Sequence, residues 1–584
     1  MKRDNRKTMG RATLAGILVA ALLLSGCGTK DTADPVASTA ESSVAETAET
    51  ERAETNSAKG VEFQNVLEPH VIDDKYRTTY EVFVYSFYDS DGDGIGDLKG
   101  LTEKLDYIND GIYGSGEDLE CNGIWLMPIF PSPTYHKYDT TDYMGIDKEY
   151  GTMEDFETFL AEAHKRGISV ILDLAVNHTS NEHPWFQEAE TYLKGLSEGE
   201  EPDSSVCPYV DYYNFSREKG NGYEPLRGTD WFYEARFWSG MPDLNLDSEA
   251  VRKEITQICR FWLEKEVDGF RLDAVTSYYT EDEKASIDFL AFLEDTVTGI
   301  KPDAYMVGEA WLGQNGYSAY YASGLDSFFD FKFAGAEGTI ATVVNKGKKA
   351  TTYTKAMEEE EILYGSLNPN FVNAPFYTNH DMARGAGYFA KGSKVKCKMA
   401  GALNLLMTGN AFIYYGEEIG MKGSGKDENK RAPMLWNSEE TEAGTCKGPK
   451  DMDRFDMPYE GVSQQLADGD SILQFYREAI RIRNAFPVIA RGYTTALDLA
   501  AVTDAEGADQ KETGSAAAFL RQGEEGDLLV LLNVSENPLT VTLPEEAASY
   551  EHLAARLLAA KGEITEEDGR ITLPGYSVGI FTRE

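Results

Sequence analysis

The sequence is poor in the residues that build metal clusters and covalent cross-links. It holds only six cysteines and seven histidines in 584 residues. The five cysteines after Cys27 are odd in number, irregularly spaced and without a C-x-x-C pair, so neither a metal cluster nor a disulfide framework is indicated. A Gly-rich phosphate loop, a Ser-His-Asp order and an internal repeat are also not apparent, which removes several common classes of enzyme and of repeat protein.

Positive charge is scarce as well. The 55 Lys and Arg residues stand against 99 Asp and Glu residues, a formal net charge of −44. Such a chain has no bulk attraction for nucleic acid, so we expect no nucleic-acid partner. Apolar residues make up 42% of the chain, enough for real cores, and its length predicts two or three domains.

The N-terminus reads as an export and anchoring segment. Five Lys and Arg residues flank the start of the apolar run 12–24, which is too short to span a bilayer and fits a signal peptide. The run ends in "LSGC", which resembles a bacterial lipobox with Cys27 as the lipidated residue. We therefore expect a signal peptide over 1–26 and a protein lipid-anchored to the membrane outside the cytoplasm. The alternative is an ordinary secretory signal.

Residues 27–60 predict an unfolded acidic tether, because the segment lacks aromatic residues and cannot bury enough apolar area to fold. From about residue 78, short apolar runs alternate with amphipathic stretches, which predicts a (β/α)₈ barrel with a parallel sheet. The expected strands are 80–87, 121–130, 168–178, 267–275, 304–311, 326–333, 373–381 and 411–418.

The barrel is predicted to span 61–178 and 247–489. The long, polar and aromatic-rich segment 179–246 after the third strand predicts an inserted subdomain. Residues 490–584 change to short alternating strands, which predicts a C-terminal β-sandwich. Among the helices, 152–167 is marked by a capping box of Thr152 with Asp155 and by Gly167 at its end.

Polar residues gather where the expected strands end, which is where the active sites of such barrels form. The run "GFRLD" places Arg271 and Asp273 on one face of a buried strand, and buried charges need a partner or a use. The residues at these strand ends are Asp173, Asn177, His178, Arg271, Asp273, Glu309, Asn379, His380 and Asp381. This set of residues is compatible with two functions, a metal site or carboxylate acid–base catalysis. Glycoside hydrolysis, which needs one carboxylate as nucleophile and one as acid, is favoured.

A family resemblance supports the second reading. "DLAVNH", "GFRLDAV", "VGEAW" and "FYTNHD", in this order, resemble the four signature regions of the α-amylase family, glycoside hydrolase family 13. "MPDLN" (241–245) resembles its fifth region and "YYGEEIGM" (414–421) its eighth strand. The resemblance covers roughly residues 75–490. It implies Asp273 as nucleophile, Glu309 as general acid and base, and Asp381 as a third carboxylate that helps to distort the sugar.

The resemblance also implies residues that hold the substrate. Arg271 would pair with Asp273 and keep it ionised, and the apolar approach to Glu309 would raise the pKa of that acid. Asp173 would be either a structural residue that orients Arg271 or a functional residue of the site. The implied substrate-binding residues are Tyr138, Asp139, His178, Arg271, His380 and Arg431.

Calcium is the expected cofactor. "DSDGDGIGDLKG" (89–100) imitates an EF-hand loop, although its twelfth position is Gly100 and a strand precedes it. The family resemblance implies a calcium loop at the same place; the alternative is a hydrated acidic turn. The expected ligands are Asp89, Asp91, Asp93, Asp97 and the carbonyl of Ile95, while Asn177 and Asp243 match ligands of a second calcium.

The specificity stays open at this level. Thr276 and Ser277 stand where many endo-acting α-amylases have Lys-His, and "MPDLN" resembles a group between oligo-1,6-glucosidases and neopullulanase-like amylases. "NKRAPMLW" (429–436), with Arg431, resembles the oligo-1,6-glucosidase side. The expected partner is therefore an α-glucan oligosaccharide or polysaccharide. The alternatives are an oligo-1,6-glucosidase or other exo-α-glucosidase, and a non-catalytic surface glucan-binding protein.

Overall fold

The computed structural model describes residues 63–68, 70–280, 282–389, 393–439 and 444–583. The expected signal peptide, the tether and Cys27 lie outside these residues. None of the described helices is both long and apolar enough to cross a membrane.

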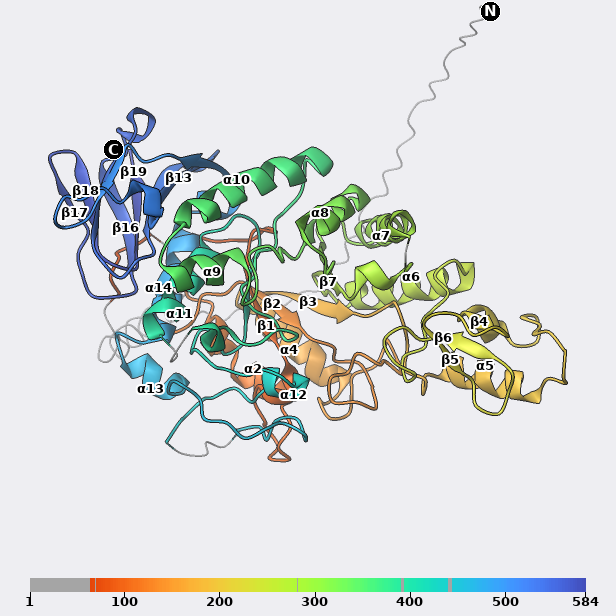
Figure 1. The fold of residues 1–584 in the computed structure, drawn as a ribbon. Coiled ribbons are helices and arrows are strands. Elements are labelled where there is room, and N and C mark those ends of the chain that lie inside the picture. The colour runs from red at the N-terminus through yellow and green to blue at the C-terminus, as the bar shows by residue number, and fades with distance from the viewer. Residues whose placement is uncertain (1–62, 69, 281, 390–392, 440–443, 584) are drawn as a thin grey trace, which may run out of the picture. The chain divides into compact units, whose positions relative to one another are not determined.

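The predicted barrel is confirmed (Figure 1). Its parallel sheet contains seven strands in the spatial order β10-β1-β2-β3-β7-β8-β9. Residues 374–376 close the ring through bridges of Ala374 to Phe329 and of Phe376 to Phe412. The bounds of the seven strands are β1 Thr78–Val82, β2 Gly123–Leu126, β3 Ser169–Leu174, β7 Gly269–Leu272, β8 Tyr305–Gly308, β9 Ser327–Phe328 and β10 Ala411–Tyr414.

The strands are shorter than the sequence predicts, and the expected strand 373–381 is reduced to two bridges. The apolar runs continue past the ladder because the residues after each strand are still buried inside the barrel mouth, as His178 and Glu309 are. The apolar runs therefore show which residues are buried, and they extend beyond the last hydrogen-bonded residues of each strand.

Register and close packing position the fourth barrel strand. Asp173 of β3 is paired with Arg271 of β7, and Arg271 with Val307 of β8. Gly269 opens β7 with a φ of +148°, and a Cβ there would lie 1.9 Å from the carbonyl oxygen of Tyr305. Only glycine allows β7 to approach β8 this closely. The first residue of the motif "GFRLD" must therefore be glycine for steric reasons.

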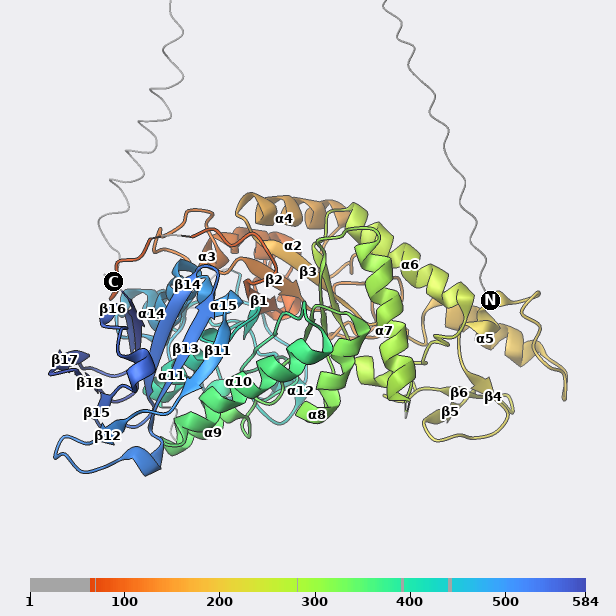
Figure 2. The same ribbon diagram turned by 90° about the horizontal axis from the view of Figure 1, so that it is seen from above.

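Helices pack around the sheet, and most have recognisable sequence signals (Figures 1 and 2). The predicted capping box of α4 is confirmed, with Thr152 and Asp155 bonded reciprocally. Helix α6 turns Val251, Ile255 and Trp262 toward the core. The helices of the barrel are α2 Leu98–Glu103, α3 Leu105–Ile108, α4 Met153–Lys165, α6 Glu249–Glu264, α7 Glu283–Thr298, α8 Gln314–Tyr317, α9 Thr339–Lys346, α10 Ala350–Leu367, α11 Lys394–Leu405, α12 Asp427–Lys430, α13 Val462–Ala467, α14 Ile472–Ala485 and α15 Val488–Arg491.

The segment after β3 forms its own small structure, which contains helix α5 (Pro184–Gly195). Its antiparallel sheet has the order β4-β6-β5, and a bridge between His178 and Asp243 ties the segment back to the barrel mouth. The three strands are β4 Phe215–Ser216, β5 Tyr223–Pro225 and β6 Phe232–Glu234.

The C-terminal part consists of two antiparallel sheets around a separate apolar core, as predicted for a β-sandwich. One sheet has the order β11-β13-β14-β19-β16 and the other β12-β15-β18-β17. The strands are β11 Tyr493–Leu497, β12 Ala501–Thr503, β13 Ala516–Gly523, β14 Gly526–Asn533, β15 Leu539–Thr542, β16 His552–Leu558, β17 Thr565–Glu567, β18 Arg570–Leu573 and β19 Ser577–Thr582.

Candidate active site

A fully buried guanidinium organises the mouth of the barrel. Arg271 Nη1 lies 2.9 Å from Asp173 Oδ1 and 2.6 Å from Asp273 Oδ1, and its Nη2 lies 2.9 Å from Glu309 Oε1. The sequence predicts the contact with Asp273 and offers Asp173 as a residue that orients Arg271, and the structure adds Glu309. One cation thus holds three carboxyl groups from β3, from the end of β7 and from the end of β8.

Glu309 is buried with only part of its hydrogen-bonding capacity used. Burial raises its pKa to about 7, against the lowering effect of Arg271 and with a further increase from Asp273. The amide of Ala274 points at its Oε2 across 3.4 Å. A carboxyl group with this pKa is partly protonated at neutral pH and can both give and take a proton.

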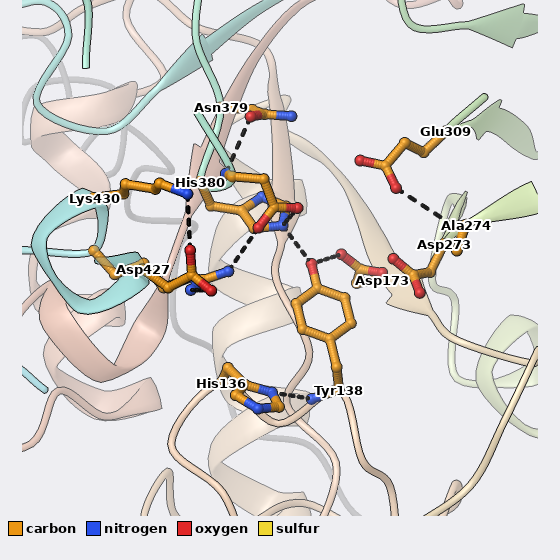
Figure 3. A network of polar contacts seen from close by, with 12 residues as sticks. His136, Tyr138, Asp173, Asp273, Ala274, Glu309, Asn379, His380, Asp427 and Lys430 are labelled. Atoms are coloured by element: carbon orange, nitrogen blue, oxygen red, sulfur yellow. Dashed lines mark hydrogen bonds and ion pairs between the residues drawn. The ribbon is translucent and has the colours of Figure 1, made fainter. Parts of the chain in front are cut away.

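His380 lies on the opposite side of the site, facing Asp273 and Glu309 across Tyr138 (Figure 3). His380 Nε2 lies 3.1 Å from Asp381 Oδ2, and its Nδ1 lies 2.6 Å from Glu81 Oε1. Burial works against the charged imidazole, but Asp381 and Glu81 raise the pKa of His380 to about 10. Burial likewise opposes the charged form of Asp381, but His380 and Arg431 lower the pKa of this carboxyl far below its usual range.

Tyr138 joins the two sides. Its hydroxyl lies 3.0 Å from Asp173 Oδ2 and 2.8 Å from His380 Nε2. Trp125 Nε1 donates to the same Asp173 oxygen across 3.2 Å. Burial raises the pKa of Asp173 to about 6, although Arg271 lowers it. Asp173 therefore holds Arg271 and Tyr138 in place, which agrees with the structural, orienting role among the two alternatives.

Arg431 is placed at the site by a loop after β10. Its Nη2 lies 2.8 Å from Asp381 Oδ1, and its Nη1 donates to the Tyr135 hydroxyl across 3.3 Å. The Ser86 hydroxyl holds its carbonyl group across 2.8 Å. Arg431 is thus fixed at both its backbone and its side chain before any ligand binds.

His178 and Asp139 differ in the hydrogen bonds that their side chains already make. His178 Nε2 is buried and, within the described part of the chain, has no hydrogen-bond partner, while the ring packs edge-on against Phe237. Asp139 Oδ1 instead accepts from the hydroxyls of Ser132 and Thr134. Asp139 therefore braces its own loop, a role that the sequence does not predict.

Two residues beside the site hold a left-handed backbone without being glycine. Lys137 has φ +64° next to Tyr138, and Ala274 has φ +45° next to Asp273. Each conformation costs about 1–2 kcal/mol and needs surrounding contacts to persist. Lys137 has such a contact, with its Nζ 3.0 Å from Asp147 Oδ2.

The acidic loop 89–97 brings part of the expected ligand set together. Asp89, Asp91 and Asp97 offer carboxylate oxygens within 4.8 Å of one another, the one such cluster found among the described residues. Asp93 is not among these three, and its Oδ1 accepts the amide of Ile95 across 2.7 Å. Three of the four expected aspartates therefore lie together, and Asp93 stays a predicted ligand.

The residues expected at a second calcium site lie together as well. Asn177 Nδ2 donates to Asp243 Oδ1 across 3.2 Å, and Asp243 Oδ2 accepts the amide of Arg236. Burial raises the pKa of Asp243 to about 7. The two side chains are hydrogen-bonded directly to each other, and this bond joins the inserted segment to the end of β3.

Several residues of the site escape sequence reasoning. Glu81, Trp125 and Tyr135 contact His380, Asp173 and Arg431 from distant parts of the chain. Only Glu81 carries a signal, as a lone acid inside the apolar run "YEVFVYSF".

Two carboxyl groups on neighbouring strands of a (β/α)₈ barrel, one paired with a buried guanidinium and one with a raised pKa, are the arrangement of a glycoside hydrolase. The comparisons with known proteins agree. Residues 81–492 match the model of the alpha-amylase catalytic domain, and residues 516–579 match the alpha-amylase SusG C-terminal domain. The chain belongs to the α-amylase family of glycoside hydrolases.

The relatives include an α-amylase and an oligo-1,6-glucosidase. Alpha-amylase 3 of Dictyoglomus thermophilum is 40% identical over 71% of this chain and 78% of its own. Oligo-1,6-glucosidase of Heyndrickxia coagulans is 29% identical over 81% of this chain and 94% of its own. The solved structure of Eubacterium rectale Amy13B is 47% identical, with a TM-score of 0.82 over 89% of this chain and 97% of that one.

Proposed function

We propose that this chain is a retaining α-glucan hydrolase that cleaves starch-derived oligosaccharides and maltodextrins outside the cell. The observation that carries the proposal is the sharing of Arg271 by Asp273 and Glu309. Retention needs about 5–5.5 Å between the two carboxyl groups, a range that two carboxylates on one guanidinium can reach. Relatives named for α-amylase and oligo-1,6-glucosidase activity support the substrate class.

In this mechanism Asp273 attacks the anomeric carbon while Glu309 gives its proton to the leaving oxygen. The bond to Asp273 forms as the glycosidic bond breaks, which leaves a covalent glycosyl-enzyme. Glu309, now ionised, takes a proton from water, and the water oxygen displaces Asp273. The pKa of about 7 suits Glu309 to both steps.

The sugar at the cleavage point would be held by groups already in position. His178 Nε2 is free to bond a hydroxyl group. The Nε2 of the charged His380 lies beside Asp381 and the Tyr138 hydroxyl, and would share its proton with a sugar hydroxyl. Asp381, kept ionised, would favour the charged, flattened ring of the transition state. Tyr138, fixed at its hydroxyl, would offer its ring face to the sugar.

Calcium is part of the proposal. The three carboxylates of Asp89, Asp91 and Asp97 are the hard oxygen ligands that this ion prefers. The bound ion would supply no chemistry to the reaction. It would cross-link the loop after β1, which also carries Ser86, the residue that holds Arg431.

A second candidate is exo-acting α-glucosidase activity, including α-1,6 cleavage. The contact of Arg431 with Asp381 favours it, because a cation fixed beside the third carboxylate narrows one side of the site.

The sequence "MPDLN" supports placement in a group between oligo-1,6-glucosidases and neopullulanase-like amylases. The "LSGC" motif supports lipid anchoring through Cys27.

A product profile tests the proposal. Purified protein would be incubated with starch, maltotriose, isomaltose, pullulan and trehalose, and products separated over time. We expect release of maltooligosaccharides from starch with little action on trehalose. Release of glucose alone, with isomaltose cleaved fastest, would favour the exo-acting candidate. Absence of products from every glucan would overturn the proposed function.

A further inference from the structure

A cleft that none of the proposed catalytic carboxylates lines is found at helix α10 and strand β11. The two elements pack side by side (Figure 2). The cleft has a volume of about 520 Å³, within the usual range of about 300–1,000 Å³ for ligand sites. Its aromatic and aliphatic lining comes from Tyr76, Phe371, Tyr493, Ile362 and Pro369.

The cleft opens at the N-terminal end of the barrel strands. Tyr76 precedes β1, Asn373 precedes the bridging residues 374–376, and Gly409 precedes β10, and all three line it. The catalytic carboxylates instead follow β7, β8 and residues 374–376. The length of the barrel therefore separates the two sites, and one short ligand cannot occupy both.

Large apolar side chains are exposed here without an apparent structural reason. Ile362 is 69% exposed and Tyr493 is 59% exposed. They stand beside polar groups of Glu358, Asn373 and Thr495. Clustered exposed apolar side chains edged by polar groups mark binding surfaces more often than isolated ones do.

The walls of the cleft are fixed by two ion pairs, one buried and one partly exposed. Arg521, fully buried in β13, contacts Glu361 of α10 across 3.1 Å, and Glu361 also accepts from Thr494. Arg491 pairs with Asp74 across 2.8 Å, and its guanidinium lies 5.8 Å from the centre of the Tyr76 ring. Both walls are therefore held before a ligand arrives, which lowers the entropy lost on binding.

We propose that this cleft is a second binding site for α-glucan chains, independent of the catalytic site; the ligand class rests on the proposed function. The apolar face of a glucosyl unit packs on the Tyr493 ring, while the carboxylate of Glu358 and the hydroxyl of Thr495 bond its hydroxyls. The ligand is uncharged, so the large negative charge of the chain does not repel it. A second site raises the affinity for long chains that reach both sites, and leaves short substrates unaffected.

The test uses the full chain with Asp273→Asn, so that bound glucan is not consumed. Isothermal titration with maltoheptaose should give two sites per chain. Adding Tyr493→Ala should leave one site and weaken binding to insoluble starch by about tenfold or more. Because Tyr493 is largely exposed, its loss removes little packing, and an unchanged melting temperature would verify this.

A matched pair of isoleucines provides the control. Ile362→Ala alters the wall of the cleft, while Ile112→Ala alters an isoleucine that is 52% exposed elsewhere. Ile362→Ala should weaken starch binding and Ile112→Ala should not, and with Asp273 intact both should keep kcat/KM on maltotriose. One maltoheptaose site in the Asp273→Asn chain, or two sites left after Tyr493→Ala, would overturn the inference. Failure of the proposed function would show separately, as no hydrolysis of starch by the unmodified chain.

Discussion

Arg271 Nη2 lies 2.9 Å from Glu309 Oε1, so the proposed general acid shares its cation with Asp273, the proposed nucleophile. A cation beside a carboxyl group lowers its pKa, yet the pKa of Glu309 is raised to about 7 because burial outweighs that effect. The pairing keeps the acid from being fully protonated at neutral pH, which suits a group that must serve as acid and then as base.

The first prediction is a basic limb in the pH profile. Glu309 must carry its proton to act as acid, so kcat/KM on maltooligosaccharides should fall as pH rises through about 7. Glu309→Gln should remove most activity on these substrates. On an aryl glycoside with a good leaving group, the first step needs no acid, and the basic limb should disappear in this variant. A basic limb that persists there would show that another group controls it.

The second prediction concerns the nucleophile. Asp273→Asn should reduce turnover on the order of 10⁴-fold or more, because a neutral amide is a poor nucleophile. The side chains are similar in size, so the melting temperature should change little. In the unmodified enzyme, proton NMR of early hydrolysis should show the α-anomer first. If the β-anomer appeared first, Asp273 would not be the nucleophile.

Much of the site follows from the sequence because parallel strands end at one edge. Residues after β3, β7 and β8 must meet at the mouth of the barrel, so Asp273, Glu309 and His178 could be placed together from their positions alone. The pairing of Arg271 with Asp273 in the motif "GFRLD" could be predicted from the sequence alone, because residues two apart on a strand share a face.

The remaining contacts depend on side-chain direction, which periodicity does not determine. Glu81 meets His380 from 299 positions away, and Asp139 turns into its own loop. The reduced seventh strand also could not be predicted. Its apolar run "NAPFYTNHD" looks like the other strands, but only Ala374 and Phe376 form bridges.

The third prediction concerns calcium. If the ion binds the folded loop better than the unfolded chain, calcium should raise the melting temperature and a chelator should lower it. Asp91→Asn should abolish the difference, because Asp91 belongs to the carboxylate cluster and is exposed. Asp303→Asn is the matched control, because Asp303 is also an exposed aspartate and does not belong to the expected ligand set. Equal effects of the two variants, or no bound metal by elemental analysis, would contradict the assignment.

The fourth prediction concerns location. Cys27→Ala should prevent lipid attachment, so the protein should be released or remain unprocessed in the producing bacterium. Membrane fractions and mass spectrometry of the N-terminus would measure this. Cys121→Ala, at a buried cysteine of the barrel, is a control that should leave membrane retention unchanged. Unchanged retention and processing of Cys27→Ala would rule out the anchor.

The last prediction links a buried acid to stability. Burial raises the pKa of Glu417 to about 8, although the hydroxyls of Thr378 and Tyr476 donate to it. Its unfolded value is near 4.5, so between these two values the folded state holds a proton that the unfolded state has lost. The free energy of unfolding should therefore fall as pH rises from about 5 to 8, and level off above that range. Glu417→Gln removes this titration while keeping the shape of the side chain. The melting temperature of the variant, relative to the unmodified chain, should increase steadily from pH 5 to pH 8. A difference that stays constant across this range would show that Glu417 titrates alike in both states.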